Sequence, residues 1–195
     1  IPTIPDLIPS KDTGESSSDN ITNDPIPTFS TSNLESGSIT KLYGYDSDNI
    51  YLTEIPVDTV AAAGSDITLT YSVTLADDIY RFYFTSQDTA GNTTYSNWSA
   101  YITIDTEEPT ASIIPSDSLV RMEDSPVITV TFNDGMTANP QIAVDFAGAD
   151  DLDITDMTNT ANDSIWTYDL TIPEGNDGTA TISIIGTDNA GNALT

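Results

Sequence analysis

Residues 105–109 read Asp105-Thr106-Glu107-Glu108-Pro109, and they separate two β-like halves of the chain. An alternating run at 100–104, Ala-Tyr-Ile-Thr-Ile, precedes them, and a second apolar run at 110–114, Thr-Ala-Ser-Ile-Ile, follows. Proline cannot donate a hydrogen bond to a sheet, so Pro109 is expected to end one strand system and start another. We therefore predict two domains, residues 1–106 and residues 107–195.

The same stretch concentrates three carboxylates, and no Lys or Arg occurs within ten positions on either side. Their mutual repulsion has to be screened. The sequence leaves two alternatives open, bulk water and a bound divalent cation.

The whole chain is strongly acidic, as this stretch is. Its 195 residues contain 31 acidic residues against Lys11, Lys41, Arg81 and Arg121, which gives a formal net charge of -27. Such a surface repels nucleic acid and anionic membranes, because neutralising phosphates requires Lys and Arg. No apolar run is long enough to span a membrane. We expect neither a nucleic-acid partner nor membrane insertion.

The chain has no Cys and no His. This excludes disulfides, thiolate or histidine zinc sites, and the familiar Ser-His-Asp and Cys-His catalysts. Paired carboxylates are frequent, but in so acidic a chain their adjacency does not indicate a glycosidase. We predict that the protein is not an enzyme.

Short runs rich in β-branched and aromatic residues recur along both halves, separated by Asn, Asp, Gly and Ser clusters. None shows a convincing 3.6-residue period, so almost no helix is expected. The expected strands are 28–30, 38–43, 50–55, 67–73, 79–85, 101–104, 112–114, 127–132, 141–146, 165–170 and 179–185. Residues 1–25 are rich in Pro, Ser and Asp, yet Leu7, Ile8 and Ile21 can pin them along a sheet edge.

A motif recurs 100 positions apart: Asp88-Thr89-Ala90-Gly91-Asn92 and Asp188-Asn189-Ala190-Gly191-Asn192. Each copy follows the densest β run of its half. The prediction is an all-β chain of two tandem Ig-like β-sandwich modules. A strand follows the first copy, whereas the sequence ends three residues after the second, so the second module is expected to lack its last strand. The start at Ile1, without Met, indicates a fragment of a longer protein.

Several segments of the sequence are similar to a known family of repeats. The segments 12–29, 88–92 and 102–106 resemble the bacterial Ig-like repeats of giant surface adhesins, the type I-secreted, RTX-type and biofilm adhesins. Residues 166–192 resemble a related Ig-like module. The resemblance implies an extracellular, cell-surface location, modules joined end to end, and calcium at the junctions. Its partners would be neighbouring modules of the same chain, and surface glycans or a host-cell ligand reached through other domains.

Sandwich geometry suggests where calcium ligands would lie. The loop before the last strand shares a pole with the N-terminus of its module. Asp188 is therefore expected near Asp105, Glu107 and Glu108. The same argument adds Asp134 of the loop 133–135 and, from the first module, Asp77 and Asp78. It also predicts that Asp88 faces an N-terminal cluster, Asp12, Asp19 and Asp24.

An alternative explains the Asp-X-Ala-Gly-Asn motif by structure alone: Asp bonds backbone N–H groups and Gly takes a positive φ. The acidic run 150–153 is interpreted as a solvated loop, and Trp98 and Trp166 as core or strand-edge aromatics. The functional prediction is an adhesin extender region that calcium rigidifies, which supports cell adhesion or biofilm formation. Two alternatives remain: a halophile surface-layer module, and a carbohydrate-binding module whose sugar-stacking residues would include Tyr43, Tyr45, Tyr51 and Trp98.

Overall fold

The computed structural model describes residues 1–52, 55–59, 66–147, 151–175 and 178–195. The chain forms two compact units, residues 1–107 and 108–195, and the boundary falls one residue after the predicted one. All regular structure in the described ranges is β-strand. The expected all-β class is confirmed.

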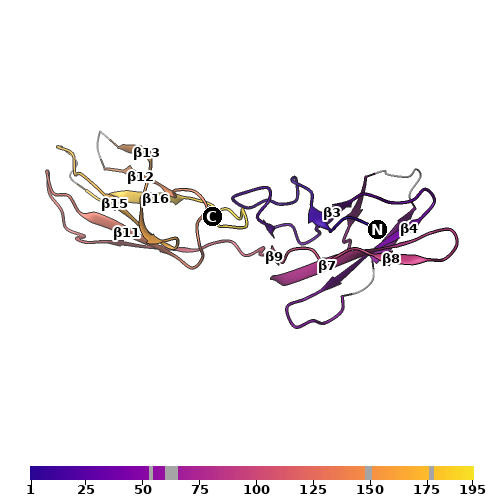
Figure 1. Cartoon of the computed structure of the whole chain (residues 1–195). Coiled ribbons are helices and arrows are strands. Elements are labelled where there is room, and N and C mark those ends of the chain that lie inside the picture. The colour runs from indigo at the N-terminus through magenta and orange to yellow at the C-terminus, as the bar shows by residue number, and fades with distance from the viewer. Residues whose placement is uncertain (53–54, 60–65, 148–150, 176–177) are drawn as a thin grey trace. The chain divides into compact units, whose positions relative to one another are not determined.

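The described residues of the two units form sixteen strands (Figure 1). They are β1 (Asp6–Leu7), β2 (Ile21–Thr22), β3 (Thr28–Thr31), β4 (Ile39–Tyr45), β5 (Ile55–Thr59), β6 (Ile67–Thr70), β7 (Asp78–Gln87), β8 (Thr93–Tyr95), β9 (Ile102–Ile104), β10 (Ala111–Pro115), β11 (Val127–Phe132), β12 (Gln141–Asp145), β13 (Leu152–Asp156), β14 (Thr158–Asn162), β15 (Ile165–Asp169) and β16 (Thr181–Ile185).

Unit 1 packs a three-stranded sheet, β1-β3-β6, against a larger one ordered β2-β9-β7-β4-β5, with β8 paired to β7. Alternation along β7 turns Tyr80, Phe82 and Phe84 inward, where all three are buried. Phe82 meets Phe29 of the opposite sheet with ring centroids 4.5 Å apart. This inter-sheet contact lies in the core of the sandwich.

Unit 2 repeats the design with sheets β10-β11-β15-β14 and β13-β12-β16. Val130 and Trp166 face Ile142 and Val144 in its core. Val130 is directly paired with Trp166 in the register of β11 and β15. The indole of Trp166 is 3% exposed, and its Nε1 donates to the Asp163 carbonyl. The interpretation of Trp166 as a core residue is confirmed.

The N-terminal segment is tied into unit 1 at two places. β1 pairs with β3 and buries Leu7, and β2 pairs with β9 in parallel. Backbone bonds from Thr103 N–H to the Asn20 carbonyl and from Asp105 N–H to the Thr22 carbonyl extend the second pairing. The expectation that this Pro-rich segment lies along a sheet edge is confirmed.

Two strand assignments from the sequence were wrong. The run 50–55 was expected to be one strand, but in its described part Tyr51 forms only an isolated bridge to Tyr45 and Ile55 begins β5, while residues 53–54 lie outside the described ranges. The reason is a tight turn in which Asp46 accepts the N–H groups of Asp48 and Ile50. The run 150–153 was interpreted as a solvated loop, yet Leu152 and Asp153 begin β13, and residues 148–150 lie outside the described ranges. After β16, residues 186–195 of unit 2 form isolated bridges, and the predicted absence of a last strand stays a prediction.

Candidate functional site

The two Asp-X-Ala-Gly-Asn motifs form the same turn. In each, Oδ1 of the Asp accepts the N–H groups of the Ala and the Asn, and Oδ2 accepts the Asn side chain, all at 2.8–2.9 Å. Gly91 and Gly191 take φ values of +90° and +95°, which L side chains rarely adopt. The turn-closure role proposed for these residues is therefore present in both copies.

Turn closure leaves part of the Asp188 carboxylate available. A carboxylate offers about four lone-pair positions, and the turn uses three of them. Asp188 is fully buried and forms an isolated bridge with Met136. Its carboxylate lies within 4.8 Å of that of Asp134. Unit 2 thus brings together two predicted ligands, from the loop after β11 and the turn after β16.

The first residues of unit 2 lie at the same end of the unit. Thr110 N–H donates to the Asn133 side chain at 2.6 Å, and Thr195 Oγ1 donates to Glu108 Oε2 at 2.8 Å. The Asn189 N–H donates to the Gly135 carbonyl, which joins the two acidic loops. The predicted neighbours Glu108, Asp134 and Asp188 therefore share one pole of unit 2.

No basic side chain is available to neutralise this pole. Arg121 is the only Lys or Arg between residues 108 and 195. It is highly exposed and pairs with Asp124 at 3.7 Å. Asp134 and Asp188 consequently form a like-charged pair without a basic partner in their own unit.

Unit 1 gathers carboxylates at the end where it joins the linker. Asp77 Oδ1 accepts both the N–H and the hydroxyl of Thr106. Asp78 is paired with Ile104 in the sheet, and the N–H of Ile79 is the main group that lowers the Asp78 pKa. Asp105 Oδ1 accepts the N–H of Glu107. Asp77, Asp78 and Asp105 thus lie at the linker end of unit 1, as the sequence predicted.

Asp12 is the most unusual carboxylate of unit 1. It is 5% exposed; its Oδ2 accepts the Asn20 N–H, but its Oδ1 is buried without a hydrogen-bond partner among the described residues. Burial, reinforced by the neighbouring Asp19, raises the pKa of Asp12. Asp24, the third predicted member of this cluster, is paired with the Lys11 ammonium instead. A buried acid with an orphaned oxygen fits a cation ligand.

One predicted relationship is wrong. Asp88 was expected to face Asp12, Asp19 and Asp24, but it lies at the other end of unit 1. Residues 20–22 run beside β9, which pairs with the Asp78 end of β7, whereas Asp88 follows the far end of that ten-residue strand. The cause is the parallel β2–β9 pairing, which carries the N-terminal cluster to the linker end. Asp88 instead lines a 60 Å³ hollow with Asn33 and Glu35.

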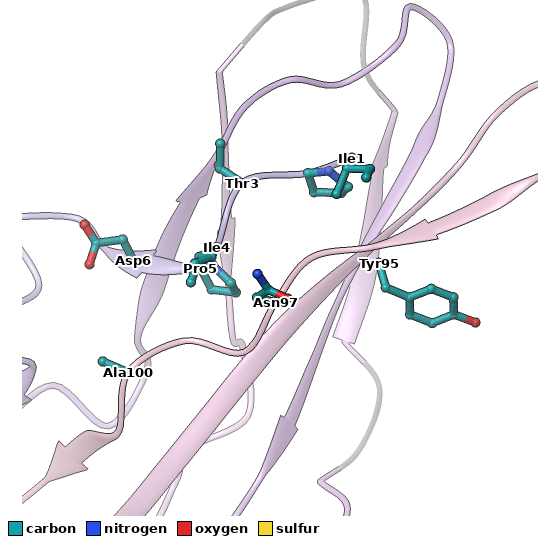
Figure 2. A pocket seen from close by; sticks show the side chains of 9 residues that line it. Ile1, Thr3, Ile4, Pro5, Asp6, Tyr95, Asn97 and Ala100 are labelled. Atoms are coloured by element: carbon teal, nitrogen blue, oxygen red, sulfur yellow. The ribbon is translucent and has the colours of Figure 1, made fainter.

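Unit 1 also has a larger hollow beside its N-terminal segment. One of about 740 Å³ lies between the N-terminal segment and residues 95–100 (Figure 2). Among its lining residues, Asp6 is the only carboxylate, and Figure 2 shows its side chain directed away from Asn97 and Tyr95. In the described part of the chain, no helix is long and apolar enough to cross a membrane.

The aromatic residues singled out for sugar stacking do come together. Tyr45 contacts both Tyr51 and Trp98, with centroids 5.4 Å apart in each pair, and Tyr43 lies 6.2 Å from Tyr51. Trp98 is 42% exposed, so it is a surface residue and not a core one. Sequence reasoning missed Tyr83 and Tyr95, which belong to the same cluster. The alternation of β7 could have indicated Tyr83, because it shares a face with Arg81.

The sequence and the structure were compared with known proteins. A family model described as a bacterial Ig-like domain matches residues 1–106. The chain is similar to a tetra-tandem repeat in the extending region of a large adhesion protein, at 18% identity and a TM-score of 0.38, covering 99% of this chain and 46% of that chain. It is also similar to fibronectin(III)-like modules of Clostridium thermocellum CbhA, at 19% identity and a TM-score of 0.40, covering 90% and 83% respectively. The chain thus spans less than half of the first of these structures, and no curated protein matches it.

Proposed function

The chain belongs to the bacterial Ig-like domain family, and on this basis we propose that it is an extracellular extender region of a surface adhesin, rigidified by calcium where modules join. The observation that carries the proposal is the pair Asp134 and Asp188. Their carboxylates lie within 4.8 Å, one of them is fully buried, and unit 2 offers them no basic partner. Burying an uncompensated charge raises the free energy of the folded state, and a bound cation would offset this cost.

Linker residues would complete the site. Glu108 is fixed at the Asp188 pole by its bond to Thr195. Asp105 precedes Glu108 by three residues, which span at most about 11 Å. The linker is therefore short enough for Asp105 and Glu107 to reach Asp134 and Asp188. We propose Asp105 and Glu107 as the ligands that join the linker to unit 2.

Calcium suits this set of donors better than magnesium. All the candidate groups are hard oxygen ligands on loops, and the Asp188 carboxylate has one free lone-pair position to contribute. Calcium accepts about six to eight such oxygens in flexible geometry, whereas magnesium demands a near-ideal octahedron and keeps its waters. Asp12 and Asp19 form a second proposed site, at the linker end of unit 1, where the orphaned Oδ1 of Asp12 would be the principal ligand.

Binding at the linker would convert a flexible connection into a stiff one. A cation held by residues of both modules and of the linker stabilises their folded, joined state by mass action. The charge of -27 would then serve two purposes: repulsion keeps the chain extended before calcium is met, and it attracts the cation afterwards. An array of such modules holds a distal binding domain away from the cell surface, which would support adhesion or biofilm formation.

The test is a thermal melt of the 195-residue protein in chelator, in millimolar calcium and in millimolar magnesium, at matched ionic strength. We expect calcium to raise the melting temperature well beyond magnesium, and small-angle scattering to show a stiffer, longer particle with calcium. Asp134→Asn should remove most of the calcium shift. Asp169→Asn makes the same charge change in unit 2 at the opposite end of β15 and should leave the shift intact.

Two results would defeat this proposal. Equal responses to both cations would reduce the acidic loops to turn closures. Stability that follows total ionic strength, whichever salt is used, would favour the halophile surface-layer alternative, in which acidity serves solvation alone.

A further inference from the structure

The outer face of the β4–β7–β8 sheet in unit 1 carries a continuous row of aromatic rings. Tyr43 and Tyr83 are directly paired across β4 and β7, and their rings stack at 5.1 Å with an interplanar angle of 10°. Tyr83 also lies 6.4 Å from Tyr95 of β8 and 4.7 Å from Trp98. Stacked and edge-on rings stabilise one another. Tyr95 nevertheless remains 62% exposed. Monomeric proteins rarely leave such a patch in water without a use for it.

A groove of about 320 Å³ runs beside this row. Tyr43, Tyr83 and Tyr95 line it on one side, and Lys41, Thr85 and Gln87 supply polar groups. Its volume is at the lower end of small-molecule sites, which occupy roughly 300–1,000 Å³. Aromatic walls combined with hydroxyl, amide and ammonium groups form a surface that is apolar and hydrogen-bonding at once.

The charge of this face differs from that of the rest of the chain. None of the eight residues that line the groove is a carboxylate, although the chain has 31 acidic residues. Lys41 lies in the groove, and Arg81 lies over the Trp98 ring at 4.6 Å while donating to Asn49. Two of the four basic residues of the chain are therefore on this one face.

These charges narrow the choice of ligand. A cationic ligand, the usual guest of an aromatic cage, would meet Lys41 and Arg81. Polyanions and a second copy of this chain would be repelled by the net charge of -27. An uncharged ligand with both apolar and hydroxyl-bearing surfaces remains. Neutral sugars have that chemistry, because their ring C–H faces pack on aromatic rings while their hydroxyls accept and donate hydrogen bonds.

We propose that this groove binds a neutral glycan. Sugar rings pack against the exposed ring of Tyr95 and the edges of Tyr43 and Tyr83. The Gln87 Oε1 accepts hydrogen bonds from sugar hydroxyls, while the Gln87 amide nitrogen donates to the Gly91 carbonyl and the Thr93 hydroxyl. Figure 2 shows the Tyr95 ring projecting away from the N-terminal segment, and the residue is 62% exposed. Arg81 acts as a positioning residue, because its contact with the Trp98 ring holds that ring against Tyr83. Unit 1 would then be an adhesive surface in its own right, in addition to its role as a spacer.

Affinity electrophoresis of the 195-residue protein tests this proposal. The native gels contain dextran, mannan, xylan or laminarin as neutral glycans, or alginate as an acidic one. We expect at least one neutral glycan to retard the protein and alginate to have no effect. Tyr95→Ala and Gln87→Ala should each weaken binding at least tenfold. Both side chains are exposed, and water can replace the two bonds that Gln87 donates to the Gly91 carbonyl and the Thr93 hydroxyl, so both variants should keep a melting temperature close to that of the wild type.

Tyr101→Ala is the matched control, because Tyr101 is 67% exposed and does not line the groove. It should bind as the wild type does. Retardation should also persist in chelator, since the groove contains no candidate cation ligand, and this separates the result from the calcium proposal. Lack of retardation by all four neutral glycans would overturn the inference. So would retardation by alginate alone, or binding that survives Tyr95→Ala.

Discussion

Asp88 and Asp188 accept the same three hydrogen bonds 100 residues apart, but Asp188 is fully buried and Asp88 is partly exposed. The local sequence dictates the turn, whereas the surroundings dictate what the turn can do. The buried copy has the Asp134 carboxylate within 4.8 Å, whereas the partly exposed copy lines a hollow with Glu35. One motif therefore closes a turn in both units and supplies a candidate cation ligand in unit 2.

Asp188→Ala is expected to destabilise unit 2 by about 2–4 kcal/mol, because it removes the buried carboxylate that accepts the N–H groups of Ala190 and Asn192. Asp88→Ala should destabilise unit 1 by less, since water can replace the lost bonds. Each unit contains one tryptophan, Trp98 or Trp166. Denaturant unfolding followed by tryptophan fluorescence measures both effects, and equal losses in the two units would contradict the expectation.

The loss of stability of unit 1 at acidic pH should depend on Asp88. The Asn92 side chain, followed by the backbone N–H groups of the turn, lowers the pKa of Asp88 below its ordinary value of 3.8. The stabilisation that results is complete above the ordinary value and is lost as the pH falls through the lowered one. Asp88→Asn should therefore weaken unit 1 at pH 6 and converge with the wild type at the lowest pH. A constant difference between the two proteins across that range would refute this assignment.

Asp12→Asn should act with opposite signs in the two media. In chelator at neutral pH it should stabilise unit 1 by about 1 kcal/mol, because burial disfavours the charged carboxylate and raises its pKa. That is roughly 4–8 °C in the melting temperature of a domain of this size. In calcium the variant should be less stable than the wild type, because a ligand has been removed. Melting curves that show destabilisation in both media would argue for a purely structural Asp12.

Gly44→Ala should destabilise unit 1 by about 1–3 kcal/mol through overpacking. A Cβ at residue 44 would lie 2.6 Å from Phe82 Cε1 and 2.8 Å from Leu52 Cδ1. Gly91→Ala tests backbone strain alone. Its Cβ would meet no atom within 4 Å, but the residue has a φ of +90°. Urea unfolding of both variants separates crowding from backbone strain. An unchanged midpoint for Gly44→Ala would mean that Leu52 moves aside without cost.

The sequence predicted the longer strands because their signal is local. The run at 127–132 matches β11 residue for residue, and alternation along residues 79–85 indicated the buried face of β7. The short strands β1, β2 and β8 were missed, since a segment such as β2 has no periodicity of its own and exists only because β9 pairs with it. The five-residue β14 was missed as well. The misplacement of Asp88 has the same origin: nothing in residues 12–24 reveals which end of the sandwich they reach.

The sequence likewise predicted only part of the candidate site. The repeat and the acidic linker indicated Asp134, Asp188 and Asp77 correctly as residues of module ends. The ion pair between Lys11 and Asp24 and the orphaned oxygen of Asp12 were not predictable, because both depend on tertiary contacts. The aromatic row was only partly foreseen, since Tyr83 and Tyr95 join it through strand register.

The parallel pairing of β2 with β9 has a mechanical consequence. A tensile force that pulls the two ends of unit 1 apart draws these neighbouring strands in opposite directions along their common axis. Their hydrogen bonds are then loaded together, in shear, and cannot be peeled open one after another as in a hairpin. This parallel pair of an early strand with the last strand of unit 1 therefore resists extension of the domain.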